Sequence, residues 1–163
     1  MRILGIDPGI GRVGWGVIEV QGSMLKLKSY GCIETEPSMS DEKRLEKLFN
    51  EISNIIKTEK PEEASIEELF FNTNAKTALV VGQARGVLLL AVSQKNIPIA
   101  TYTPLQVKIA LTGYGRAEKN QVGQMVKTIL KLDKIPKPDD AADALAIALT
   151  HAFSYKTNKL RVK

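Results

Sequence analysis

The sequence is short of the residues that build several common kinds of site. It holds a single cysteine, Cys32, which excludes an internal disulfide framework and fits a reducing cytosol. Cys32 falls in a strand-like stretch, and we interpret it as a core thiol rather than a nucleophile. His151 is the only histidine, so no cluster of His and Cys ligands competes for a metal. We expect His151 to be a partly exposed residue near a helix end, where a cation suits the helix dipole.

Long apolar runs are missing as well. No run approaches the ~20 residues that cross a bilayer. The first residues enter a strand-like segment directly, so we expect neither a membrane span nor a signal peptide. Internal repeats and low-complexity segments are absent, and 163 residues suit one domain with a full core. We therefore expect one cytoplasmic domain over residues 1–155 and a basic, mobile tail over residues 156–163.

Charge is unevenly spread along the chain, which has a net charge of +5. Residues 105–137 carry seven Lys or Arg against two acids, and residues 156–163 carry four and no acid. Residues 138–155 lie between them, with three Asp and no Lys or Arg. A nuclease needs this layout, with cations for the phosphate backbone and carboxylates for a metal. A solvated basic helix face beside an Asp-capped helix explains the same charges.

The apolar pattern predicts three antiparallel strands followed by helices that alternate with strands. Ser40 or Asp41 can cap the first helix, which Pro61 ends, and Asn74 can cap the second. This order implies a mixed five-stranded sheet with helices on both faces. The expected strands are residues 2–7, 13–20, 25–34, 64–67 and 97–102, and the later helices are 75–94, 105–111, 117–132 and 139–154.

Two acids stand at the ends of apolar strands. Asp7 precedes the turn at Pro8-Gly9, and Glu67 ends the fourth strand. If these strands are parallel neighbours, ~4.8 Å apart, both carboxylates reach the carboxyl edge of the sheet, where open sheets place their sites. Glu68 would point to the opposite side. Taken singly, Asp7 could instead cap the turn, and Glu67 could be a surface residue that opens a loop.

Three further acids open the last helix. Asp140 and Asp143 are one turn apart and share a helix face. The helix dipole explains Asp139 and Asp140, but it is a weaker explanation for Asp143, which lies a full turn in. Converging carboxylates would repel each other without cations, and Mg²⁺ is the expected partner, with Mn²⁺ as a substitute. Two ions ~3.5–4 Å apart could activate the attacking water and stabilise the leaving 3′ oxygen.

Six strings follow one another along the chain: Gly5-Ile6-Asp7-Pro8-Gly9, Ile66-Glu67-Glu68-Leu69-Phe70, Gly82-Gln83-Ala84-Arg85-Gly86-Val87, Leu105-Gln106-Val107-Lys108, Ala117-Glu118-Lys119 and Asp140-Ala141-Ala142-Asp143-Ala144-Leu145-Ala146. Taken in order, these strings resemble the RuvC family of bacterial Holliday-junction resolvases. The resemblance runs from about Arg2 to His151. Sugar-kinase-like ATPases also open with a strand, Asp and Gly, but this chain is short and lacks a second glycine-rich phosphate loop.

The resemblance implies a ribonuclease H-like fold and a homodimer. It implies Mg²⁺-dependent, paired, symmetric nicking of four-way DNA junctions in recombination and repair, leaving 5′-phosphate and 3′-hydroxyl ends. The branch-migration proteins RuvA and RuvB are implied partners. By position, the catalytic and metal-binding acids are Asp7, Glu67, Asp140 and Asp143, and the D-x-x-D spacing selects Asp140 over Asp139.

The resemblance also assigns DNA contacts. Lys108 and Lys119 match basic residues near the scissile strand, and Phe70 matches an aromatic that stacks on an unpaired junction base. Ordinary core packing is the alternative for Phe70. Arg116, in the basic stretch, is a further candidate DNA contact.

Three features depart from the family pattern: Val13 replaces a common Thr, Glu68 replaces a common Gln, and the tail is short. The helix at residues 75–94 is apolar nearly all round, and Gly82 and Gly86 allow close helix approach. Its partner is either its own sheet or a second subunit. Two other functions stay open: a ribonuclease H-like nuclease acting on other structured nucleic acid, and a non-catalytic junction-binding module with vestigial acids.

Overall fold

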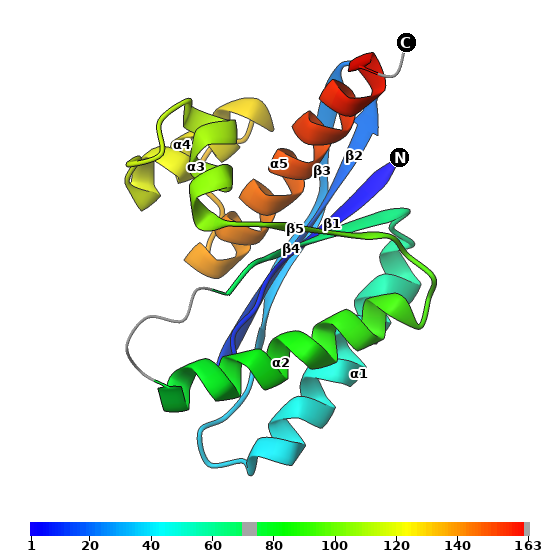
Figure 1. The fold of residues 1–163 in the computed structure, drawn as a ribbon, viewed down its shortest axis with the longest axis vertical. Helices are drawn as coiled ribbons and strands as arrows, with labels where there is room; N and C mark the ends of the chain where they lie inside the picture. The colour runs from blue at the N-terminus through cyan, green and yellow to red at the C-terminus, as the bar shows by residue number, and fades with distance from the viewer. Residues whose placement is uncertain (70–74, 162–163) are drawn as a thin grey trace.

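A five-stranded mixed sheet forms the centre of the computed structural model, which describes residues 1–69 and 75–161 (Figure 1). The strand order is β3-β2-β1-β4-β5, with β1, β2 and β3 antiparallel and with β4 and β5 parallel to β1. The predicted sheet is confirmed, including the central β1 and its parallel neighbour β4. The strands are β1 (Arg2–Asp7), β2 (Arg12–Gln21), β3 (Met24–Glu34), β4 (Glu63–Glu67) and β5 (Ile99–Tyr102).

Helices cover both faces of the sheet, as predicted. Two helices lie on one face and three on the other, and each face has its own apolar core (Figure 1). Leu4, Leu48 and Leu88 are fully buried on the first face, and Ile3 and Leu145 on the second. The first pair is α1 (Asp41–Glu59) and α2 (Ala75–Ser93), and the second group is α3 (Pro104–Thr112), α4 (Lys119–Ile129) and α5 (Asp139–Arg161).

Capping residues explain where two helices begin. Thr103 forms a capping box with Gln106, so α3 begins one residue earlier than expected, at a proline that fits the first turn. Glu118 forms the same kind of box, so α4 begins at Lys119 rather than at residue 117. At the other end of the chain, α5 continues to Arg161, past its expected end at about residue 154. Mobility of the tail stays a prediction.

Glycines let α5 lie unusually close to the sheet. A Cβ on Gly5 would collide with the carbonyl oxygen of Ala144, and a Cβ on Gly14 would collide with that of Asp140. On the helix side, Ala141 and Ala144 are fully buried, as expected for small residues at a close contact. The first two turns of α5 are therefore held against the carboxyl end of β1.

His151 does not lie where the sequence analysis placed it. Its exposed fraction is only 7%, so the expectation of a partly exposed residue is wrong. The side chain lies on the side of α5 that packs over β4 and β5, where Tyr102 and Glu63 replace water as its hydrogen-bonding partners. Among the described residues, no helix is long and apolar enough to cross a membrane.

Candidate active site

Asp7 and Glu67 meet at the carboxyl edge of the sheet. The parallel register pairs Ile6 with Ile66, so the two strands end side by side, each on an acid. Asp7 shares the face of Gly5, which contacts α5, and Glu67 follows the same alternation from Ser65, the partner of Gly5. Both carboxylates therefore project toward α5. The predicted convergence of these two strand ends is confirmed.

Asp143 approaches Glu67 from the start of α5, and Asp140 lies near enough for its charge to raise the pKa of Asp7. The backbone of Asp140 lies on Gly14, opposite the end of β1. Asp143 follows one turn later and lines a cavity of about 180 Å³ together with Glu67, Lys108 and Lys119. We call this cavity the active-site cleft. It combines two of the predicted acids with two of the predicted basic residues.

The pKa values of Asp7, Glu67 and Asp143 are all raised above their ordinary values. Burial raises the pKa of Asp7 to about 8, and the charges of Glu67, Asp143 and Asp140 add to this effect. Burial also raises the pKa of Glu67, with a further contribution from Asp143. The pKa of Asp143 is raised by burial, although Lys119 opposes this change. With a pKa of about 8, Asp7 is mostly protonated at neutral pH even beside Lys119, and a further cation would favour its ionised form.

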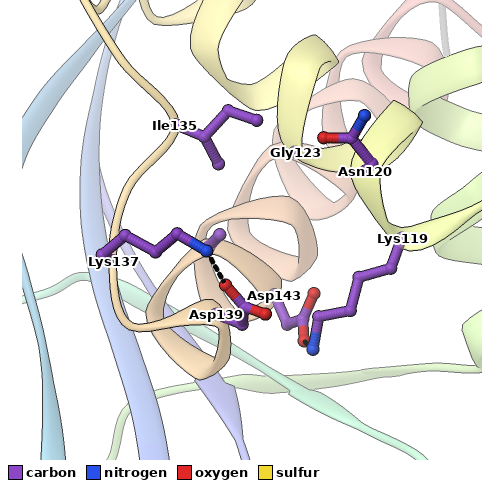
Figure 2. Close-up of a pocket in the computed structure, with 8 residues that line it drawn as sticks. Lys119, Asn120, Gly123, Ile135, Lys137, Asp139 and Asp143 are labelled. Atoms are coloured by element: carbon purple, nitrogen blue, oxygen red, sulfur yellow. Dashed lines mark hydrogen bonds and ion pairs between the residues drawn. The ribbon is translucent and has the colours of Figure 1, made fainter.

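Lys119 supplies positive charge at this position. Its Nζ lies 2.6 Å from Oδ2 of Asp143, and Figure 2 shows the two side chains meeting. The ammonium charge also partly offsets the rise in the pKa of Asp7 and of Glu67. Asp139 pairs with Lys137 at 2.5 Å, and it lines one pocket together with Asp143 and Lys119 (Figure 2). The choice of Asp140 over Asp139 as a ligand therefore stays a prediction from the D-x-x-D spacing of the family.

The donor set fits a hard divalent cation. Carboxylate oxygens are the ligands that Mg²⁺ takes in proteins, and the raised pKa values reflect repulsion that a cation would offset. Within residues 1–69 and 75–161, no three acidic, His or Cys side chains lie as close together as the ligands of one ion. In this arrangement the Lys119 ammonium is the positive charge beside Asp143.

Other predicted site residues lie apart from the acids. Arg116 is exposed on the loop between α3 and α4. Phe70 lies outside the described residues. Val13 is fully buried in the core beneath α1 and α2, and Glu68 is exposed. Cys32 is half-buried, and burial followed by the charge of Asp140 raises the pKa of its thiol, which fits an unreactive cysteine.

Arg85 is a residue whose role the sequence analysis missed. Its Nε donates to the carbonyl oxygen of Glu67 at 3.1 Å, and its guanidinium also reaches Oγ1 of Thr101 at 3.4 Å. It therefore secures the end of β4 that carries the acid. The available signal was a lone arginine inside the apolar helix α2.

Comparisons with known proteins identify the family of this chain. The family model described as "Crossover junction endodeoxyribonuclease RuvC" matches residues 3–151. A protein of that description from Desulforamulus reducens is 55% identical over 163 residues, covering 100% of both chains. The structure of Thermus thermophilus RuvC in complex with a Holliday junction substrate has a TM-score of 0.92 and 38% identity, covering 97% of this chain and 96% of that one.

A more distant likeness bears on the fold alone. The crystal structure of a yeast mitochondrial Holliday junction resolvase has a TM-score of 0.65 at 18% identity, covering 91% of this chain and 77% of that one. With the Thermus structure, it confirms the ribonuclease H-like resolvase fold. The chain belongs to the RuvC family of crossover junction endodeoxyribonucleases.

Proposed function

We propose that this chain resolves four-way DNA junctions by Mg²⁺-dependent paired nicking, leaving 5′-phosphate and 3′-hydroxyl ends. The observation that carries the proposal is the approach of Asp7, Glu67 and Asp143 to one another beside Lys119. After burial, the charges of Glu67 and Asp143 raise the pKa of Asp7, and the charge of Asp143 raises the pKa of Glu67. Four acids gathered near the end of a central strand do not favour stability, because their repulsion costs free energy. Their arrangement is accounted for by cation binding and phosphodiester cleavage.

Each group of residues has a distinct part in the reaction. Asp7, Glu67, Asp140 and Asp143 would hold two Mg²⁺ ions, with Asp7 as the shared ligand because it is central among the four. Held by these acids, the ions would supply activation of the attacking water and would offset charge on the leaving 3′ oxygen. Lys108 and Lys119, both lining the active-site cleft, attract and orient the scissile phosphate.

Contacts away from the cleft would hold the junction. Arg116 is exposed on the same side of the sheet as α3 and α4, where it can reach the DNA backbone. We assign base stacking to Phe70 through the family resemblance alone. We place the protein in the cytoplasm with its DNA substrate, and we expect RuvA and RuvB to act with it.

A homodimer would match the two-fold symmetry of the junction. Its support is a stripe on the outer face of α2. Leu79 and Leu90 are 65% and 53% exposed, and nothing lies within 4 Å of the Cβ positions of Gly82 and Gly86. These four positions lie on one side of the helix, so a second α2 could approach closely. Light scattering should show a dimer for the parent and a monomer for Leu90→Arg.

The test of the function uses synthetic DNA. Mobile and immobile four-way junctions, a linear duplex and an RNA–DNA hybrid are incubated with the protein, with Mg²⁺ or with EDTA, and the nicks are mapped. We expect symmetric paired nicks in the junctions only, and only with Mg²⁺. Equal cutting of the hybrid would favour a different ribonuclease H-like nuclease. Junction binding without cutting would favour a non-catalytic module, and parental activity in Asp7→Asn would refute the role of Asp7.

A further inference from the structure

A partly buried polar chain of Tyr102, His151 and Glu63 lies between α5 and the β4–β5 side of the sheet, outside the active-site cleft. Oη of Tyr102 is 2.9 Å from Nδ1 of His151, and Nε2 of His151 is 3.4 Å from Oε2 of Glu63. With Glu63 ionised and the imidazole neutral, one arrangement satisfies both contacts. Nε2–H donates to the carboxylate and Nδ1 accepts from the phenol, since a carboxylate has no proton to donate.

Tyr102 connects this chain to two parts of the active site. In the β4–β5 register it is the partner of Glu67, and its carbonyl oxygen accepts from the amide of Glu68 at 2.8 Å. The next residue, Thr103, caps α3 through a complete capping box. Lys108 lies on α3 and lines the active-site cleft. A shift of Tyr102 would therefore displace both Glu67 and Lys108.

His151 connects the polar chain to α5, the helix that carries Asp140 and Asp143. It lies on α5 beyond Asp143, about 12 Å along the helix axis at the usual rise per residue. Glu63, at the other end of the polar chain, is the first residue of β4, and Glu67 is the last residue of that strand. One buried imidazole thus bonds the helix that carries Asp140 and Asp143 to both strands beside it.

We propose that His151, Tyr102 and Glu63 are positioning residues of the nuclease. Their hydrogen bonds fix α5 against β4 and β5, and so they fix Asp143 relative to Glu67 and Lys108. The inference rests on the proposed nuclease function. It adds a cause for the geometry of the site, because small displacements of catalytic groups reduce rates strongly even when the fold is intact.

The first test removes one hydroxyl. Tyr102→Phe keeps the ring and loses the bond to Nδ1 of His151, and Tyr114→Phe, at a 57% exposed tyrosine, is the matched control. We expect single-turnover nicking by Tyr102→Phe to fall about fivefold, the rate equivalent of one neutral hydrogen bond. The Mg²⁺ concentration for half-maximal rate should rise, whereas metal-free junction affinity should stay at the parent value.

A second pair of variants tests the carboxylate end. Glu63→Gln keeps an oxygen that can accept from Nε2–H, whereas Glu63→Ala does not, so the glutamine variant should recover most of the rate that alanine loses. Imidazole nitrogen shifts, measured by NMR without metal or DNA, should show the Nε2–H tautomer of His151 in the parent. They should change in Tyr102→Phe and stay unchanged in Tyr114→Phe.

Three outcomes would overturn the positioning role alone. They are a parental rate in Tyr102→Phe, equal losses in Glu63→Gln and Glu63→Ala, and a rate loss that matches the loss of folded protein measured by circular dichroism. If the parent itself fails to nick any junction, the proposed function fails, and the positioning role fails with it. The two failures are therefore distinguishable.

Discussion

Replacing Asp7 by asparagine should stabilise the metal-free protein while abolishing nicking. The folded protein holds the Asp7 carboxyl among three other acids, and its pKa rises from 3.8 to about 8. Because the folded-state pKa is raised, the favourable contribution of this group is complete below pH 3.8 and is lost as the pH rises toward 8. Asparagine does not titrate, so the variant should gain stability over the parent across that window.

The size of the effect can be bounded. Displacing a titration by one pH unit is worth about 1.4 kcal/mol, so the raised pKa of Asp7 sets an upper limit of about 6 kcal/mol. Asp7 is only partly buried in the folded chain, so an effective dielectric constant of about 20 is appropriate, and we expect about 2 kcal/mol. For a chain of this length, that corresponds to roughly 4–8 °C in Tm.

The assay is thermal unfolding in EDTA at about pH 5 and about pH 8.5, where the ionised fraction of Asp7 differs most. The advantage of Asp7→Asn should be small at the lower pH and large at the higher one. Asp133→Asn, at an exposed aspartate, removes the same charge and should show no such trend. Adding Mg²⁺ should stabilise the parent more than Asp7→Asn. A variant that is less stable than the parent at the higher pH would refute the reasoning.

Three other substitutions test the surroundings of the acids. Gly14→Ala forces a Cβ onto the carbonyl of Asp140, so unfolding should show a loss of about 1–3 kcal/mol and nicking should fall with it. Lys119→Gln removes the ammonium that lowers the pKa of Asp143, so the acid limb of the pH–rate profile should move to higher pH. Arg85→Gln frees the end of β4, and single-turnover nicking should fall about tenfold; an unchanged rate would contradict that role.

Local patterns in the sequence were sufficient for most of the fold. Alternating apolar residues placed the strands, and helical spacing such as that of Leu48, Ile52 and Ile56 placed the helices, because backbone periodicity decides which side chains share a face. Element ends were less accurate, since caps such as Glu118 depend on side-chain bonds that propensity does not resolve.

The sequence alone also determined which acids were candidates, because Asp7 and Glu67 end apolar strands and Asp140 and Asp143 share one helix face. It could not decide between metal ligands and ordinary caps. Tertiary structure brought the acids together, by pairing β1 with β4 and by seating α5 on Gly14. Convergence depends on contacts between segments far apart in the chain, and local pattern carries no information on those.

The same reason explains the two residues whose roles were misjudged. His151 was expected near water and is buried, and Arg85 was given no role and secures the end of β4. Each partner of these side chains lies on a different element, so only the folded chain supplies it. A polar residue inside an apolar helix must find such a partner when it is buried, and its identity is decided by packing rather than by its neighbours in sequence.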